Sequence, residues 1–183
     1  MSTQPPALPD TSPVPPETKD WTVVLTDGCP DCGFDPGYDV ATTGERVRAT
    51  TGRWAAVLDR PGVTDRPRPG TWSPLEYAAH VRDLCRVFRG RLHLMLTQED
   101  PVFPDWDQDA AAVEAAYNRQ DPRAVAEQLT EQARATAAAF DAVTAAQWSR
   151  PGRRGDGKDF TVAGFAAYFL HDVEHHLRFD ARG

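Results

Sequence analysis

The chain contains 183 residues with 20 basic and 27 acidic side chains, so its formal charge at neutral pH is −7. This length supports one domain whose hydrophobic core does not need a metal in order to fold. The acidic balance excludes non-specific binding to nucleic acid or to anionic membranes, because both require a basic surface. With three cysteines and no apolar run long enough to cross a bilayer, the sequence predicts a cytoplasmic protein without a disulfide framework.

The first 39 residues are predicted to lie outside the main domain. Residues 1–20 are rich in proline and poor in large apolar side chains, so we expect a flexible or extended arm. Residues 21–39 begin with a short apolar run and continue into the turn-rich motif CPDCG, and we expect this segment to dock on the domain. Residues 40–183 then form the domain itself.

Two helices are predicted in the first half of this domain. Between Val47 and Leu58, apolar residues recur every three or four positions, and a Pro-Gly pair follows. The next helix has a sharp start, because Ser73 is a good N-cap, Pro74 suits the first helical position and Glu76 can complete a capping box. Its apolar stripe predicts a length of about 24 residues.

Two further long helices are predicted in the second half. Asp121 and Pro122 are typical of a helix start, and Thr161 is a good N-cap for the last helix, which should run to about Phe179. A short helix is expected over residues 110–117. Because no stretch alternates with the period of a strand, the prediction is an all-α four-helix bundle with long connections.

All five histidines lie on the second and the last of these helices. His171 and His175 are four residues apart, so their imidazoles share a helical face, as two metal ligands require. His80 is the best third ligand, because His93 lies about 20 Å farther along the same helix and His176 is rotated by about 100° from the pair. Three imidazoles would leave open positions on the ion, as in catalytic sites.

The sequence around these histidines resembles a known family. The segment GTWSPLEYAAH ends at His80, and the segment YFLHDVEHHL contains His171 and His175. In residue type, order and helix position, the two segments resemble the DinB superfamily over roughly residues 40–179. This superfamily includes DNA-damage-inducible helical proteins, thiol-dependent S-transferases and the mycothiol-dependent maleylpyruvate isomerase.

The resemblance implies an up-up-down-down bundle that holds one divalent ion, zinc or nickel, through His80, His171 and His175. It also implies a thiol S-transferase that joins a low-molecular-weight thiol such as mycothiol to a small electrophile, because a metal stabilises the thiolate at neutral pH. A metal-dependent hydrolase is the alternative, since the same site could activate water. A third hypothesis is a non-catalytic, stress-related metal-binding protein. Apolar positions on the first and last helices are compatible with a homodimer.

Five other side chains lie close to these histidines in the sequence. Tyr77 and Tyr168 are each about one turn before a histidine and are expected either to contact substrate or to pack in the core. Glu76 either closes the capping box or supports a ligand. Asp172 and Glu174 either accept a hydrogen bond from an imidazole or face solvent. No residue is assigned as catalytic.

The motif that contains Cys29 and Cys32 has three interpretations. A thioredoxin-like redox motif requires a βαβ unit, which is not predicted here. A zinc site needs two more ligands, and only Cys85, His93 and His176 remain once the other histidines are assigned. We therefore expect the two thiols to pack the segment onto the bundle.

Overall fold

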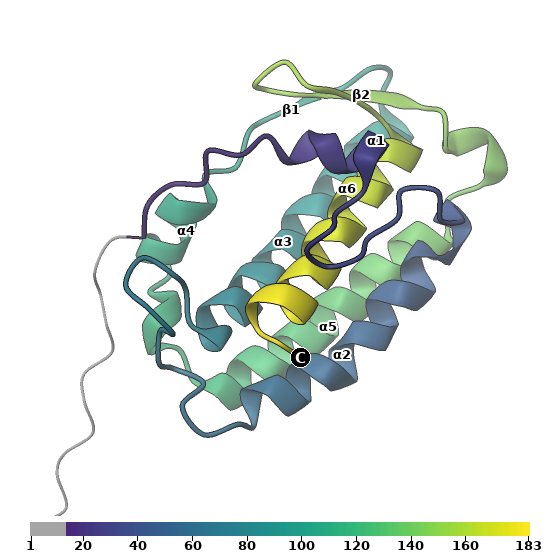
Figure 1. Cartoon of the computed structure of the whole chain (residues 1–183). Coiled ribbons are helices and arrows are strands. Elements are labelled where there is room, and N and C mark those ends of the chain that lie inside the picture. Colours follow the sequence, from purple (N-terminus) through teal and green to yellow (C-terminus); the bar gives the residue numbers. More distant parts are fainter. Residues whose placement is uncertain (1–13) are drawn as a thin grey trace, which may run out of the picture.

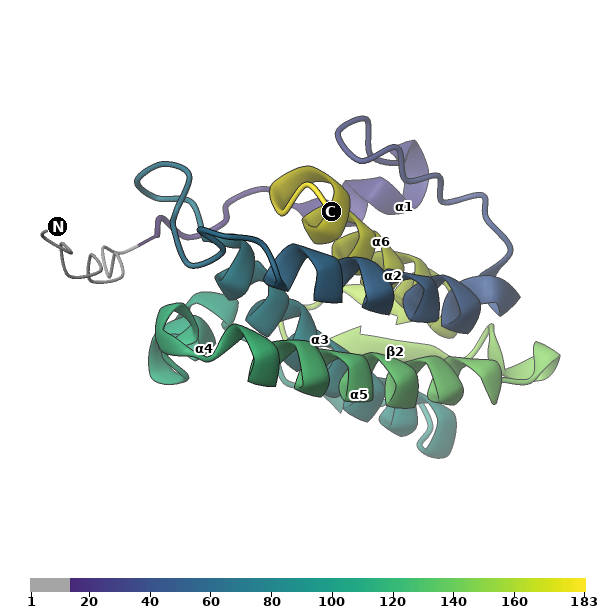
Figure 2. The same cartoon turned by 90° about the horizontal axis from the view of Figure 1, so that it is seen from below.

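The computed structural model describes residues 14–183, and Figure 1 shows long helices packed side by side with the N-terminal segment running along one face. α5 packs against both α2 and α3, and α6 contacts the same two helices; Figure 2 shows α2 and α5 alongside each other. The predicted arm falls partly on residues 1–13, which lie outside the described residues. The bundle helices are α2 (Thr43–Leu58), α3 (Pro74–Thr97), α5 (Pro122–Asp141) and α6 (Val162–His175).

The helix starts follow the predicted caps. The Ser73 hydroxyl accepts a hydrogen bond from the Glu76 backbone N–H at 3.2 Å, and the Glu76 carboxylate accepts one from the Ser73 N–H at 2.8 Å. Asp121 accepts from two backbone N–H groups at the start of α5, and the Thr161 hydroxyl accepts from Gly164 at the start of α6. Each cap satisfies N–H groups that have no partner within the helix.

Aromatic side chains fill part of the core between α3, α5 and α6. The Phe88 ring on α3 lies 4.6 Å from Phe165 and 5.2 Å from Phe169, and Phe169 lies 5.4 Å from Phe140 on α5. Complete burial of such a side chain contributes about 1.5–3 kcal/mol. Contacts between these rings join α3, α5 and α6.

A small sheet departs from the all-α prediction. β1 (Val102–Phe103) pairs in parallel with β2 (Pro151–Arg154), and β2 pairs antiparallel with β3 (Asp159–Thr161). The fold is therefore mostly helical with a three-stranded sheet in its connections. Strands of two to four residues are too short to show alternation in a sequence, and they form here because tertiary packing brings two distant connections together.

The last helix also differs from its prediction. α6 ends at His175, and the chain continues as a π-helical turn over His176–Asp180. Such a turn changes the direction in which the following side chains point, and π-helical turns are frequent at functional sites. Two short α-helices, α1 (Val24–Asp27) and α4 (Gln108–Glu114), and four single-turn 3-10 helices also form in the described part of the chain. No helix among residues 14–183 is long and apolar enough to cross a membrane.

Candidate functional site

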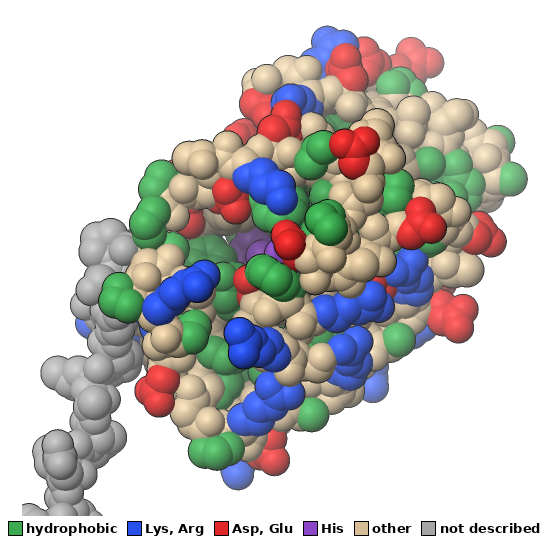
Figure 3. Space-filling model, viewed as in Figure 1, with side chains coloured by type: hydrophobic (Ala, Val, Ile, Leu, Met, Phe, Trp, Pro, Cys, Tyr) green, Lys and Arg blue, Asp and Glu red, His purple; other side chains and the backbone are tan. Residues whose placement is uncertain are grey.

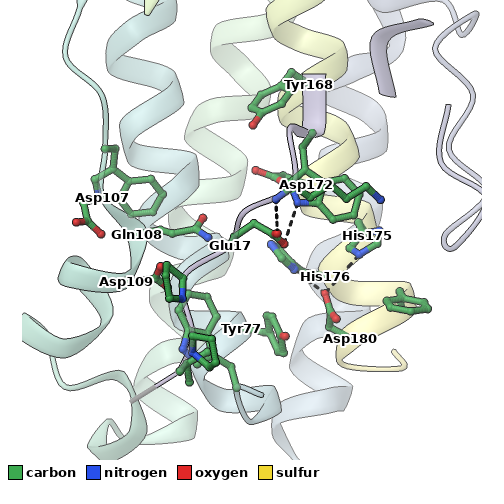
Figure 4. A pocket seen from close by; sticks show the side chains of 18 of the residues that line it. Glu17, Tyr77, Asp107, Gln108, Asp109, Tyr168, Asp172, His175, His176 and Asp180 are labelled. Carbon is green, nitrogen blue, oxygen red and sulfur yellow. Dashed lines mark hydrogen bonds and ion pairs between the residues drawn. The ribbon is translucent and has the colours of Figure 1, made fainter. Parts of the chain in front are cut away.

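A pocket of about 650 Å³ opens between α3, α6 and the segments that precede α1 and α4. Histidine side chains are visible in a hollow of the surface in Figure 3, and Figure 4 shows the pocket from close by. Trp72, Tyr77 and Trp106 supply aromatic surface on one side. The polar and charged residues along its wall are Glu17, Lys19, Asp31, Asp105, Asp107, Gln108, Asp109, Arg154, Tyr168, Asp172, His175, His176 and Asp180.

His80 lies directly behind this pocket and is fully buried. Its ring stacks on Trp106 at 5.3 Å, lies 5.3 Å from Trp72 and meets His176 edge to face at 4.9 Å. Neither ring nitrogen of His80 has a hydrogen-bond partner among the described residues. Burial, followed by the nearby His176, lowers the pKa of His80 far below its ordinary value, so the imidazole is neutral.

His176 is oriented by a carboxylate. Its Nδ1 lies 2.8 Å from Asp180 Oδ2, which Figure 4 shows beside it on the π-helical turn. Burial opposes protonation of the ring, but the hydrogen bond to Asp180 and the charge of Asp172 outweigh it, so the pKa of His176 is raised. Histidines that bind metals commonly have such a carboxylate on their other nitrogen.

A second cluster lies on another side of α6. One sulfur from each of Cys29 and Cys32 and one nitrogen from each of His171 and His175 all lie within 4.8 Å of one another. Three of the four residues are buried, and the Trp21 ring covers both imidazoles at 5.2 and 5.0 Å. Burial raises the pKa of Cys32 to about 11 and lowers the pKa of His171 to about 3. The described part of the chain therefore contains a group that could hold a metal ion.

The structure brings together only two of the three ligands predicted from the sequence. His171 and His175 meet Cys29 and Cys32, whereas His80 lies against His176 and is not part of the cluster. The reason is the rotation of about 100° per helical residue. His171 and His175 face the N-terminal segment, and His176 faces α3.

The other predicted residues divide into two groups. Tyr77, Tyr168 and Asp172 line the pocket. Glu76 lies at the start of α3, where it completes the capping box and pairs with Arg66 at 2.5 Å. Glu174 is buried and pairs with Arg46 of α2 at 2.7 Å, so it fastens α6 to α2.

Cys29 is buried in the core and Cys32 packs against it, as expected, and the sulfurs of both residues also face imidazoles. The signal was present in the sequence as a C-x₂-C pair and an H-x₃-H pair, each of which is half of a four-ligand site. Because both histidines of that pair were placed in a site with His80, their contact with the two cysteines was not predicted from the sequence. The role of His176 with Asp180 was missed because the π-helical turn has no signature in the sequence.

The fold and the histidines at one end of its core define a DinB-like helical bundle. The family model of the DinB superfamily matches residues 43–179, and the chain belongs to this superfamily. Among solved structures, one described as "YfiT from Bacillus subtilis is a probable metal-dependent hydrolase with an unusual four-helix bundle topology" is similar, with a TM-score of 0.65 and 22% identity over 76% of this chain and 81% of that chain. At this identity the likeness concerns the fold. No curated protein matches the chain.

Proposed function

We propose that this protein is a metal-dependent enzyme that joins a low-molecular-weight thiol, of the mycothiol type, to a small electrophile in the pocket between α3 and α6. The observation that carries the proposal is the fully buried His80, whose two nitrogens have no hydrogen-bond partner in residues 14–183, beside a histidine that a carboxylate orients. A buried polar atom without a partner costs about 1–3 kcal/mol. Such an arrangement suits a histidine that binds a ligand.

The residues present fit a divalent ion. His80 and His176, whose rings lie 4.9 Å apart, would supply two imidazoles, and the other positions on the ion would stay open. Of the His80, His171 and His175 set predicted from the sequence, only His80 belongs to this proposed pair. Zinc and nickel both accept such ligands. A bound ion there would stabilise a coordinated thiol as thiolate at neutral pH.

Three side chains of the chain itself have separate tasks in this proposal. Asp180 holds His176 through Nδ1 and so fixes the orientation of its ring. Asp172 is the carboxyl group that can take the thiol proton and return it to the product, because burial raises its pKa toward the range in which general bases work. Tyr77 stays protonated, since burial raises its pKa, and its hydroxyl can donate to an oxygen of the electrophile.

Aromatic rings would position the electrophile. Trp72 and Tyr77 meet at 5.5 Å, and Tyr77 lies 5.1 Å from His176, so a flat apolar wall adjoins the proposed reaction centre. Tyr168 lines another part of the pocket and packs on Phe88 and Phe160. Its role as a substrate contact remains part of the proposal.

Hydrolysis by activated water is the second candidate. The similar solved structure is described as a probable metal-dependent hydrolase, and the same open positions would accept water in place of a thiol. A non-catalytic metal-binding protein is the third. A cytoplasmic location and a homodimer stay predictions. Among the described residues, the exposed large apolar side chains are scattered, and none of them lies on α2.

The test measures turnover of a model electrophile, monochlorobimane, by protein purified without an affinity tag. We expect turnover to require both an added thiol and a divalent metal. Loss of a residue that only hydrogen-bonds to a metal ligand lowers activity by roughly 10–100-fold, so His80→Ala, which removes a proposed ligand, should lower turnover by more than that. His93→Ala is the matched control, because His93 is exposed on the same helix. Ester turnover without thiol would indicate the hydrolase. If His80→Ala kept both the thiol-dependent turnover and the ester turnover of the wild-type protein, the proposed site would be contradicted.

A further inference from the structure

Four possible metal donors lie close together between α6 and the segment that contains Cys29 and Cys32. Cys29 Sγ lies 3.5 Å from His175 Nδ1, and all four donor atoms lie within 4.8 Å of one another. Zinc bonds of about 2.3 Å to sulfur and 2.0–2.1 Å to nitrogen place tetrahedral sulfur and nitrogen ligands about 3.6 Å apart. The observed separation therefore needs no rearrangement of the two side chains.

The surroundings of the cluster also indicate a ligand. His171 is 1% exposed, and neither of its ring nitrogens has a hydrogen-bond partner within residues 14–183. Trp21, Phe34 and Phe179 place their rings within 5.0–5.5 Å of the two imidazoles and limit the access of water. Unpaired buried nitrogens are unfavourable, and a bound cation would satisfy them.

The backbone of the motif is built to present both sulfurs. Gly28 has φ of 70°, and a Cβ atom at this position would lie 2.6 Å from the Phe34 carbonyl oxygen. The Cys29 N–H donates to that same oxygen at 2.9 Å, and the Gly33 N–H donates to the Cys29 carbonyl at 2.8 Å. This turn holds its shape through its own hydrogen bonds.

The second nitrogen of His175 has a carboxylate near it. Nε2 lies 3.7 Å from Asp180 Oδ2, while Nδ1 faces the Cys29 sulfur. A carboxylate beside the outer nitrogen is the usual partner of a metal-bound imidazole. The arrangement assigns Nδ1 of His175 as the donor.

We propose that Cys29, Cys32, His171 and His175 bind one zinc ion in a closed site that fastens residues 21–34 to α6. Mixed thiolate and imidazole ligands favour zinc over magnesium or calcium, and four protein ligands leave no position for substrate. This ion is distinct from the one proposed for the pocket. Glu17, Lys19 and Trp21 precede the clamped motif and line the pocket, so the zinc site holds part of the pocket wall in place.

The first test is metal content. The double variant Cys29→Ser/Cys32→Ser should contain about one zinc per chain less than the wild-type protein, and Cys85→Ala should lose none, because Cys85 is buried on α3 away from the cluster. His80→Ala should also keep this zinc, which separates the site from the proposed pocket ion. Equal zinc in the wild type and the double variant would overturn the proposal.

The second test uses the wild-type protein and so does not depend on how a variant folds. Cobalt substitution should give a sulfur-to-metal charge-transfer band without added thiol, and bound zinc should protect Cys29 and Cys32 from alkylation until a chelator is added. Rapid alkylation of both cysteines in zinc-loaded protein would overturn the proposal. A mass two hydrogens lower before reduction would show a Cys29–Cys32 disulfide and would overturn it as well.

Discussion

α6 and the turn that follows it present histidines to two regions that differ in kind. His171 and His175 meet sulfur inside a ring of aromatic side chains, whereas His176 meets His80 and carboxylates at the edge of a pocket. Four protein donors are enough for a closed tetrahedral site, while a site with fewer protein donors leaves positions open. Histidines that follow one another along α6 and its C-terminal turn thus suit a structural metal site in one region and a catalytic site in the other.

Asp180 connects the two regions. Its Oδ2 atom lies 2.8 Å from His176 Nδ1 and 3.7 Å from His175 Nε2, and both contacts are drawn in Figure 4. The shorter contact is the one to His176. A change at this carboxylate should therefore affect the pocket more than the cysteine cluster, and it offers a way to separate them.

The largest expected effect is a loss of folding stability at acid pH, in protein from which a chelator has removed any metal. Burial lowers the pKa of His80 and brings that of His171 to about 3, so below pH 6.5 the unfolded chain binds more protons than the folded protein. Stability is then complete above pH 6.5 and falls as the pH falls, by up to about 1.4 kcal/mol per pH unit for each such histidine. His176, whose pKa is raised, works in the opposite direction and loses its contribution as the pH rises.

Urea unfolding at pH 7.5 and 5.5 measures this loss. In His80→Phe the free energy of unfolding should change less with pH than in the wild-type protein. In His93→Phe it should change as much as in the wild-type protein, because His93 is exposed. Equal free energies of unfolding at the two pH values would show that these imidazoles are not buried in the neutral form.

A smaller effect is expected from Asp180→Asn. The amide keeps the shape of the side chain but removes the charge that supports His176, so thiol-dependent turnover should fall by about 10–100-fold. The zinc of the cysteine cluster should be retained, since the contact to His175 is the longer one. Asp59→Asn, at the exposed end of α2, is the control. Loss of the cluster zinc with intact turnover would reverse the assignment of the two regions.

The smallest effect concerns the charge of the thiol. Seven carboxyl side chains and two cations line the pocket, and one of these cations, Arg154, is already paired with Asp156 at 2.7 Å. A neutral thiol should therefore have a KM a few-fold lower than glutathione, with a difference that shrinks at high salt because exposed charges are screened over about 8–10 Å. Asp107→Asn and Asp109→Asn should each reduce the difference between the KM values of the neutral thiol and of glutathione. Equal KM values at low salt would contradict the electrostatic argument.

The four long helices and their starts are encoded locally and could be predicted from the amino-acid sequence. Capping is local, since Ser73 and Glu76 are three residues apart and Asp121 directly precedes Pro122. The apolar spacing along each helix is equally local. The motifs that contain His80 and His171 also indicate the superfamily from residue type and spacing alone. The up-up-down-down order of the helices stays a prediction.

Which histidines share a site depends instead on how distant segments pack. The assignment requires knowing which side of α6 faces the N-terminal segment and which faces α3, and a single residue step rotates a side chain by about 100°. Cys29 and His175 are 146 residues apart, and no local pattern encodes their contact. The short strands and the π-helical turn could not be predicted for the same reason, because packing between distant segments produces them.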